Sequence, residues 1–274
     1  MTLKVATFNI NQGGVFKIPS LLPLFDELQV DIFAFQEVNI PFESRVSWIS
    51  RWKALGFHAV LCSAAEGTSA VALVSRFPCK EIIAAEVVDQ NRFAAAMFEF
   101  AIGSAPNTRQ FRKLLIANVY AHVTNTVVRD ALVHEAVAFL EQSAHPWILL
   151  GDFNMTNTEG AVNDLINRGA AACLDEPFAL LPETTRPAGH RRLDFGLSSH
   201  GIFPVERCQT ASLSDHDIVS YSFPGWGQPS GFVFPRRIPF GDKDRPKIRS
   251  FSADLHAFSQ FQNSLFFFYF DAAW

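Results

Sequence analysis

Several acidic and amide side chains in this sequence follow directly after an apolar segment. Asp152 and Asn154 follow the run WILLG, Glu37 ends the run DIFAFQE, and Asn9 ends VATFN. Ligands and catalytic groups collect at the ends of core strands, so we expect these side chains to converge. Carboxylate and amide oxygens suit Mg²⁺ or Mn²⁺ rather than Zn²⁺.

The tetrad GDFN, residues 151–154, is the most specific of these patterns. Asp152 and Asn154 are two residues apart, so in extended structure both side chains point the same way. A carboxylate beside an amide can take a proton from a water nucleophile and orient the oxyanion. Gly151 is interpreted as permitting a tight turn at the strand end. The alternative is an Asx-type turn without catalytic function.

An imidazole and two further carboxylates lie late in the sequence. Asp215 and His216 precede the run IVSYSF, and histidine is the natural proton donor and phosphate contact near neutral pH. Asp194, in RRLDF, is a candidate to hold His216 in one tautomer. The alternatives are a surface loop for residues 214–216 and a salt bridge between Asp194 and Arg192.

Hydrophobic periodicity indicates the elements that must position these residues. The patterns predict four helices, around residues 21–28, 44–55, 128–140 and 159–167. They also predict strands at 3–9, 31–38, 70–75, 81–88, 92–102, 113–120, 147–151, 193–197 and 218–223. Strand runs without intervening helices alternate with strand–helix–strand units. This order favours a two-sheet core with helices outside.

Six short blocks together resemble the endonuclease/exonuclease/phosphatase superfamily. In chain order they are TFNIN (7–11), FQEV (35–38), NVYAH (118–122), GDFN (151–154), RRLDF (191–195) and SDH (214–216). The superfamily includes DNase I-like nucleases, deadenylases, inositol polyphosphate 5-phosphatases and neutral sphingomyelinases. The blocks most resemble retrotransposon-type and exonuclease III-like endonucleases. The resemblance implies an α/β fold, a four-layer sandwich of two packed mixed β-sheets flanked by helices.

The resemblance also implies a role for each matching position. Glu37 would be the main Mg²⁺ ligand, with Asn9 and Asp215 helping to hold the metal. Asp152 would activate water and Asn154 would orient it. The remaining implied roles are a phosphate contact for Tyr120, transition-state stabilisation for His216 and pairing with His216 for Asp194.

Other positions are predicted to contact substrate. Asn11 stands where many apurinic endonucleases carry a metal-binding Asp. His122 either replaces a substrate-contacting Asn or acts as a second catalytic histidine, unless it is a half-buried histidine at a strand end. Arg192 belongs to a basic cluster that is a candidate phosphate contact. Trp48 and Trp52 are candidates for stacking on bases.

Composition limits the remaining possibilities. Residues 224–274 carry six basic and four acidic side chains, a net charge of +2. Because the whole chain has a net charge of −4, residues 1–223 carry −6. We therefore predict a catalytic domain over 1–223, then a Gly/Pro-rich linker and a Phe-rich tail over 224–274. Four widely spaced cysteines indicate free thiols in a reduced compartment. Without a signal peptide or membrane span, we expect an intracellular monomer, nuclear or cytoplasmic.

The resemblance to retrotransposon-type and exonuclease III-like endonucleases implies a Mg²⁺-dependent endonuclease that cuts DNA rather than RNA, with Mn²⁺ as a possible substitute. One alternative is a phosphatase or phospholipase acting on inositol phosphates or sphingomyelin, and another is an RNA deadenylase. An alternative of a different class is a non-catalytic binding module, which the acidic body and unusual tail would suit.

Overall fold

Two mixed β-sheets form the core of the computed structural model, which describes residues 2–14, 16–62, 64–102, 110–178, 184–212, 214–226 and 228–229. Among these residues the first sheet has six strands in the order β11-β12-β1-β2-β4-β3. These strands are β1 (Leu3–Asn9), β2 (Ile32–Pro41), β3 (His58–Leu61), β4 (Thr68–Ser75), β11 (Glu206–Thr210) and β12 (Ile218–Phe223).

The second sheet, counted over the same described residues, has seven strands. Their order is β13-β6-β7-β8-β10-β9, with β5 also paired to β6. They are β5 (Cys79–Ile82), β6 (Phe93–Ile102), β7 (Gln110–Tyr120), β8 (Trp147–Asp152), β9 (Ala172–Cys173), β10 (Asp194–Ser198) and β13 (Gln228–Pro229).

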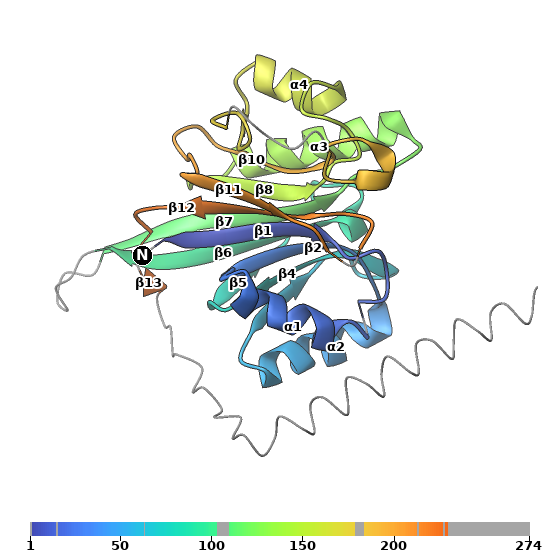
Figure 1. Cartoon of the computed structure of the whole chain (residues 1–274), viewed down its shortest axis with the longest axis vertical. Helices are drawn as coiled ribbons and strands as arrows, with labels where there is room; N and C mark the ends of the chain where they lie inside the picture. Colours follow the sequence, from blue (N-terminus) through green and yellow to red (C-terminus); the bar gives the residue numbers. More distant parts are fainter. Residues whose placement is uncertain are drawn as a thin grey trace, which may run out of the picture. The chain divides into compact units, whose positions relative to one another are not determined.

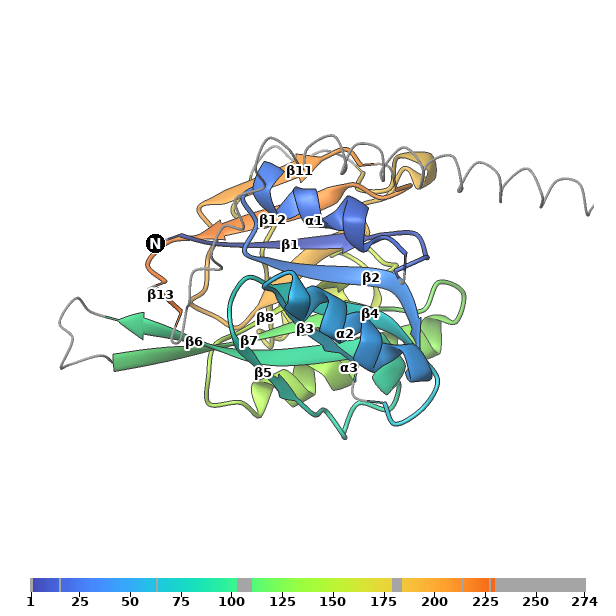
Figure 2. The same cartoon turned by 90° about the horizontal axis from the view of Figure 1, so that it is seen from below.

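Helices cover the outer face of each sheet, so the predicted four-layer α/β sandwich is confirmed (Figures 1 and 2). Helices α1 (Ile18–Glu27) and α2 (Arg45–Ala54) pack on the first sheet, and α3 (Thr126–Glu141) and α4 (Gly160–Asn167) pack on the second. Short 3₁₀ turns occupy Phe42–Ser44, Gln90–Arg92 and Pro187–Gly189.

The strands are apolar on both faces because the other sheet covers one face of each sheet and helices cover the opposite face. In β8, Ile148 and Leu150 face the other sheet, whereas Leu149 faces the helices. Gly151 continues this strand and does not make a turn, which corrects the role predicted for it. A Cβ there would lie 2.2 Å from the carbonyl oxygen of Val119 on β7, so glycine permits close strand packing.

Most predicted elements are present, with small shifts at their ends. The strand predicted over 81–88 is wrong beyond Ile82, where β5 ends. Ala84 and Val87 are buried three residues apart in an irregular segment, so their spacing does not follow the two-residue alternation of a strand. The short strands β3, β9, β11 and β13 were not predicted.

The chain continues to pack on the second sheet after Phe223. Trp226 is buried, its ring centroid lies 5.2 Å from that of Phe100, and the guanidinium of Arg112 lies 4.2 Å above its ring. Residues 230–274, including the Phe-rich tail, lie outside the described residues. The domain boundary after Phe223 stays a prediction.

A buried polar network joins the two sheets through their apolar interface. Gln36 on β2 donates a 2.7 Å hydrogen bond to the side-chain oxygen of Asn118 on β7. The amide of Asn118 in turn donates 2.8 Å bonds to the carbonyls of Phe35 and Ala72. Gln36 also bonds to the hydroxyl of Thr7. The network therefore fixes how β7 lies against β2 and β4 of the opposite sheet.

We predict that Asn118→Ala lowers the free energy of unfolding by about 3 kcal/mol, because it leaves buried donors and acceptors unpaired. Urea denaturation followed by circular dichroism measures this loss. Asn167→Ala, at an exposed position at the end of α4, is the matched control and should change stability by less than about 0.5 kcal/mol. Equal effects of the two substitutions would contradict a special role for the network.

Candidate active site

The strands that carry the predicted site residues end at the same edge of the sandwich. In the first sheet, parallel pairing aligns Asn9 of β1 with Gln36 of β2, next to Glu37. In the second sheet, Asp152 of β8 is aligned with Tyr120 of parallel β7 and with Asp194 of antiparallel β10. The pairing of each sheet thus gathers its polar residues before any side-chain contact is considered.

Asn9 links the two halves of this group. Its side-chain nitrogen donates one 3.0 Å hydrogen bond to Glu37 Oε1 and another to Asp152 Oδ2. Tyr120 donates a third bond to the same Glu37 oxygen, at 2.9 Å. Asn9 is buried, so its amide holds carboxylates of opposite sheets at a fixed separation.

Glu37 reaches the site through an irregularity in β2. The pairing of β2 with β4 shifts register between Gln36 and Ile40, and Glu37 lies within this bulge at φ 55°. A left-handed conformation costs a non-glycine residue roughly 1–2 kcal/mol. Bulges re-aim side chains near functional sites, and here the bulge directs a carboxylate toward Asn9 and Tyr120.

Behind Asp152 lies a buried carboxylate–imidazole pair. His216 Nδ1 is 2.8 Å from Asp194 Oδ2, and His216 Nε2 is 3.9 Å from Asp152 Oδ2. All three side chains are buried. The imidazole therefore lies between two carboxylates, an arrangement that favours its protonated form.

Burial and neighbouring charges shift the pKa values of these three groups. Burial, with the negative charge of Asp194, raises the pKa of Asp152 to about 7. Burial also raises the pKa of Asp194. For His216, burial alone disfavours the cation, but the hydrogen bond and charge of Asp194, helped by Asp152 and Asp215, raise its pKa to about 9.

Thr185 is hydrogen-bonded to Asp194 of this carboxylate–imidazole pair, although no sequence pattern identified it. Its hydroxyl donates a 2.7 Å bond to Asp194 Oδ2 and accepts 3.0 Å bonds from the backbone nitrogens of Leu193 and Asp194. It is fully buried. Thr185 lies in an irregular segment before β10, and a long-range contact of this kind leaves no local periodicity to detect.

Asn154 adjoins the proposed base through both backbone and side chain. Its backbone nitrogen donates a 3.0 Å bond to Asp152 Oδ1, and its side-chain nitrogen donates to the carbonyl of Ala121 at 2.8 Å. The residue has φ 50°, and Arg129 donates to its carbonyl. These contacts fix the amide next to Asp152.

Asp215 lies at the more exposed side of the site. Ser214 donates hydrogen bonds to the carbonyl of Asn9 at 2.7 Å and to Asp215 Oδ1 at 3.4 Å. Arg186, which the sequence did not suggest, forms an ion pair with Asp215 Oδ2 at 3.2 Å. Asp215 is therefore adjacent to the end of β1 and is paired with the Arg186 cation.

His122 forms a second carboxylate–imidazole pair, beside Tyr120. Its Nε2 is 2.7 Å from Asp89 Oδ2. Arg92 lies 3.6 Å from the same carboxylate, donates to the carbonyl of Tyr120, and stacks 4.6 Å above the Tyr120 ring. The structure thus places His122 next to the central group, with partners from the segment before β6.

The remaining predicted contacts have different surroundings. The backbone nitrogen of Asn11 donates to Asn9 Oδ1 at 3.0 Å, while the residue itself is exposed. Arg192 is half-buried, and its contact with substrate stays a prediction. Trp48 and Trp52 are buried beneath α2, so the prediction that they stack on bases is wrong.

The donor set fits a hard divalent cation. Glu37 and Asp215 supply carboxylate oxygens at half-buried positions, and Asn9 lies between them and Asp152. Asp152, Asp194 and His216 also offer ligand atoms within 4.8 Å of one another. However, both ring nitrogens of His216 face carboxylates, and metal binding needs a neutral imidazole. Glu37 and Asp215 are therefore the better candidate ligands.

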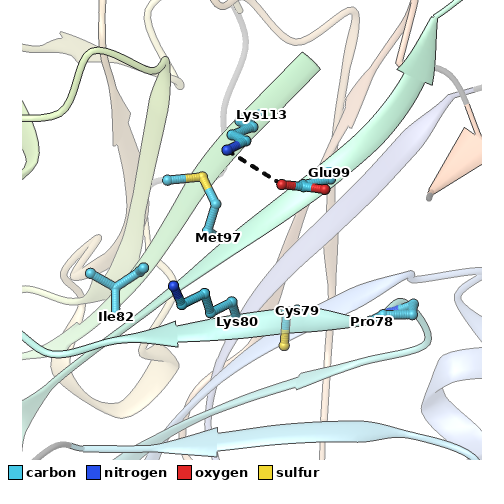
Figure 3. Close-up of a pocket in the computed structure, with 7 residues that line it drawn as sticks. All are labelled: Pro78, Cys79, Lys80, Ile82, Met97, Glu99 and Lys113. Carbon is cyan, nitrogen blue, oxygen red and sulfur yellow. Dashed lines mark ion pairs between the residues drawn. The ribbon is translucent and has the colours of Figure 1, made fainter. Parts of the chain in front are cut away.

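A hollow elsewhere on the second sheet is separate from this group. It has a volume of about 430 Å³ and is lined by Pro78, Cys79, Lys80, Ile82, Met97, Glu99 and Lys113. Figure 3 shows Lys113 facing Glu99, and their charged atoms are 3.4 Å apart. None of these lining residues belongs to the group described above.

Comparisons with known proteins agree with this architecture. The profile of the Endonuclease/Exonuclease/phosphatase family matches residues 6–216. No curated protein matches the sequence. No helix in the described part of the chain is long and apolar enough to cross a membrane.

Three solved structures illustrate the similarity of fold. The 3′ phosphatase NExo from Neisseria, bound to a product DNA hairpin, gives a TM-score of 0.58 at 19% identity, covering 81% of this chain and 100% of that one. The AP endonuclease from Archaeoglobus fulgidus gives 0.56 at 15% identity, covering 81% and 100%. The human nocturnin catalytic domain gives 0.56 at 17% identity, covering 81% and 94%.

We predict that the His216 imidazole titrates near pH 9 in EDTA-treated protein, measured by NMR of the ring protons. Asp194→Asn should lower this pKa by at least one unit, because it removes the main charge that favours the cation. The pKa of a histidine in an unfolded chain is about 6.5. Protonated His216 therefore stabilises the fold fully below about pH 6.5, and this contribution disappears as the pH rises through 9. A pKa unchanged by Asp194→Asn would contradict the assignment.

Proposed function

The chain belongs to the endonuclease/exonuclease/phosphatase family of phosphoester hydrolases, and we propose that it is a Mg²⁺-dependent phosphodiesterase that cleaves DNA. The supporting observation is the pair of hydrogen bonds from Asn9 to Glu37 and Asp152. These bonds set a metal-binding carboxylate and a basic carboxylate side by side, with the His216 cation next to the base.

The charge of the substrate explains why these groups are needed. A phosphodiester resists attack because its negative charge repels nucleophilic oxygen. In the proposed site Glu37 and Asp215 hold Mg²⁺, with Mn²⁺ as a substitute, and the ion when bound neutralises charge on the phosphate and the leaving oxygen. Asn9 supports both carboxylates without adding charge.

Asp152 is the proposed general base. Its raised pKa lies near neutral pH, where a carboxylate is most effective at removing a proton from water. Asn154, whose backbone is anchored to Asp152, is placed to orient the water and the phosphate. The water oxygen bonds to phosphorus as its proton passes to Asp152, the phosphorus–oxygen bond on the opposite side breaks, and the leaving alkoxide takes a proton from solvent.

His216 is the proposed stabiliser of the transition state. Its raised pKa keeps it cationic at neutral pH, and Asp194 with Thr185 fixes its orientation. Preorganised charge of this kind contributes strongly to catalysis in sites that exclude water. Tyr120, which is hydrogen-bonded to Glu37, is proposed to make a second contact to the phosphate.

DNA is the proposed substrate because one of the similar structures, the 3′ phosphatase, is bound to a product DNA hairpin, and another is an AP endonuclease. Hydrolysis of a terminal phosphate is a second candidate. The cation Arg186 beside Asp215 favours it, since a terminal phosphate carries nearly two negative charges at neutral pH. A monomeric state and a nuclear or cytoplasmic location stay predictions.

We predict that the purified chain nicks supercoiled plasmid in Mg²⁺ and that EDTA abolishes the reaction. Asp152→Ala and His216→Ala should each reduce the rate by roughly 10²–10⁴-fold, as expected for loss of a positioned base and of a preorganised positive charge, respectively. Agarose-gel quantification over time gives the rates. Asp164→Ala and His134→Ala, an ion pair between α3 and α4, are matched controls and should keep full activity.

Other outcomes would redirect the proposal. Release of phosphate from a 3′-phosphorylated hairpin without nicking would favour the second candidate. Inositol phosphates, sphingomyelin and polyadenylated RNA test the remaining alternatives. Binding of metal without turnover of any of these substrates would instead support a non-catalytic module.

We also predict that His122→Ala raises KM about tenfold and leaves kcat nearly unchanged, because a substrate contact supplies binding in the ground and transition states alike. Steady-state kinetics on a fluorescent oligonucleotide separate the two constants, with His134→Ala as the control. If the turnover rate instead drops by about two orders of magnitude or more, the Asp89–His122 pair takes part in chemistry.

A further inference from the structure

A buried ion pair joins the two sheets on the side of β11. Arg207 and Gln209 lie two residues apart on this strand, so their side chains share one face of it. The Arg207 side chain is 1% exposed, and its Nε donates a 2.8 Å hydrogen bond to Oδ1 of Asp175, which follows β9 of the second sheet. Tyr221 of β12 donates a 2.6 Å bond to the same oxygen. A buried guanidinium is costly to leave unpaired, so Asp175 fixes the direction of Arg207.

Arg207 in turn fixes the orientation of the Gln209 side chain. Its two terminal nitrogens each lie 3.3 Å from Gln209 Oε1. A guanidinium has only donors, so the amide oxygen must be the atom that faces it. The amide nitrogen then points the other way, where it donates to the carbonyl of Thr184 at 2.6 Å and to Asp217 Oδ2 at 2.8 Å. Both of these atoms are acceptors, so the contacts agree with one orientation of the amide.

These two acceptors belong to the backbone segments that hold the carboxylate–imidazole pair of the site. Thr184 precedes Thr185, whose hydroxyl bonds to the carboxylate of the pair, and Asp217 follows His216. The backbone nitrogen of Asp217 also donates a 2.7 Å bond to the carbonyl of Thr185. The amide of Gln209 therefore ties the segment behind the carboxylate to the segment that carries the imidazole.

We propose that Gln209 is a positioning residue for the His216 imidazole, because its amide holds residues 184–185 and 216–217 together in a direction that Arg207 sets. The inference rests on the proposed function, since the orientation of His216 matters for catalysis only if this imidazole stabilises the transition state. Gln209 acts through its hydrogen bonds to the two segments and not by touching the substrate.

The position of the imidazole depends on these segments. His216 Nδ1 is 2.8 Å from Asp194, and Nε2 is 3.9 Å from Asp152, so a small rotation of the ring changes both distances. Catalytic groups must stay within about 0.5 Å of the productive geometry. Residues 184–185 and 216–217 belong to no helix and to no strand of the two sheets. Side-chain bonds must therefore supply the positioning that sheet pairing gives to Asp194.

Two substitutions of Gln209 test this role in the full-length protein. Gln209→Met removes the amide donor and acceptor at similar length. Gln209→Glu keeps an oxygen for Arg207 but turns a second acceptor toward the Thr184 carbonyl and the Asp217 carboxylate, so the anchor remains while the tie is lost. Circular dichroism establishes that each variant is folded.

The control is a buried hydrogen bond of the same sheet that does not involve either segment. Ser198 lies at the opposite end of β10 from Asp194, is fully buried, and donates a 3.2 Å bond to the carbonyl of Ile202. Ser198→Ala removes this bond and so reports the effect of a general loss of stability.

Two measurements separate positioning from stability. Steady-state kinetics on a fluorescent oligonucleotide with Mg²⁺ give kcat and KM. NMR of EDTA-treated, ¹⁵N-histidine-labelled protein follows the Nδ1 proton of His216, which is identified by its absence from His216→Ala. A proton held in a short, charge-assisted hydrogen bond to a carboxylate reports directly on that bond.

We expect both Gln209 variants to lower kcat about tenfold, as is typical for groups that orient a catalytic side chain, with KM within about twofold of wild type. The Nδ1 proton signal of His216 should broaden or shift in both variants. Ser198→Ala should leave kcat and the signal unchanged.

The inference would be overturned by folded Gln209 variants that keep the wild-type kcat, or that lose it while the His216 signal stays unchanged. An equal loss of kcat in Ser198→Ala would also overturn it. If the wild-type protein cleaves no substrate, the proposed function fails, and the NMR signal alone then decides whether Gln209 orients the imidazole.

Discussion

The contact between the two sheets determines whether a site can exist at all. Their interface is largely apolar, and apolar packing alone does not specify register to a fraction of an ångström. The buried bond between Gln36 and Asn118 supplies that specificity. Gln36 is one residue before Glu37, and Asn118 is two residues before Tyr120. The same contact that aligns the sheets therefore also aligns the side chains at the strand ends. Asn9 then makes the final bridge to Asp152.

The close packing of buried charged groups in this site shifts their pKa values. Asp152 and Asp194 are both buried, and the imidazole of His216 lies between them. Burial and repulsion raise the pKa of each carboxyl group, whereas the carboxylates raise that of the imidazole. The result is a base and a cation that are both suited to neutral pH. The outer carboxylates, Glu37 and Asp215, remain more accessible to an ion from solvent.

Sequence patterns predicted much of this arrangement because strand ends are local features. Apolar runs located the core strands, and the polar residues after them, such as Asp152 and Glu37, are the ones that the structure brings together. Residues 81–88 were mispredicted because Ala84 and Val87 pack against the sheet from an irregular segment. Thr185 and Arg186 were missed because their partners, Asp194 and Asp215, are reached only through tertiary folding.

The position of β12 has a consequence for biosynthesis. β1, near the start of the chain, pairs with β12, near the end of the body, and His216 lies just before β12. Pairing over so long a separation forms late, because the loop between the strands must close first. A ribosome-bound chain therefore lacks its imidazole, and one edge of β1 is unpaired, until β12 has been synthesised. The nascent polypeptide should be inert toward phosphoesters near the ribosome, and its exposed β1 edge is a natural point for chaperone capture.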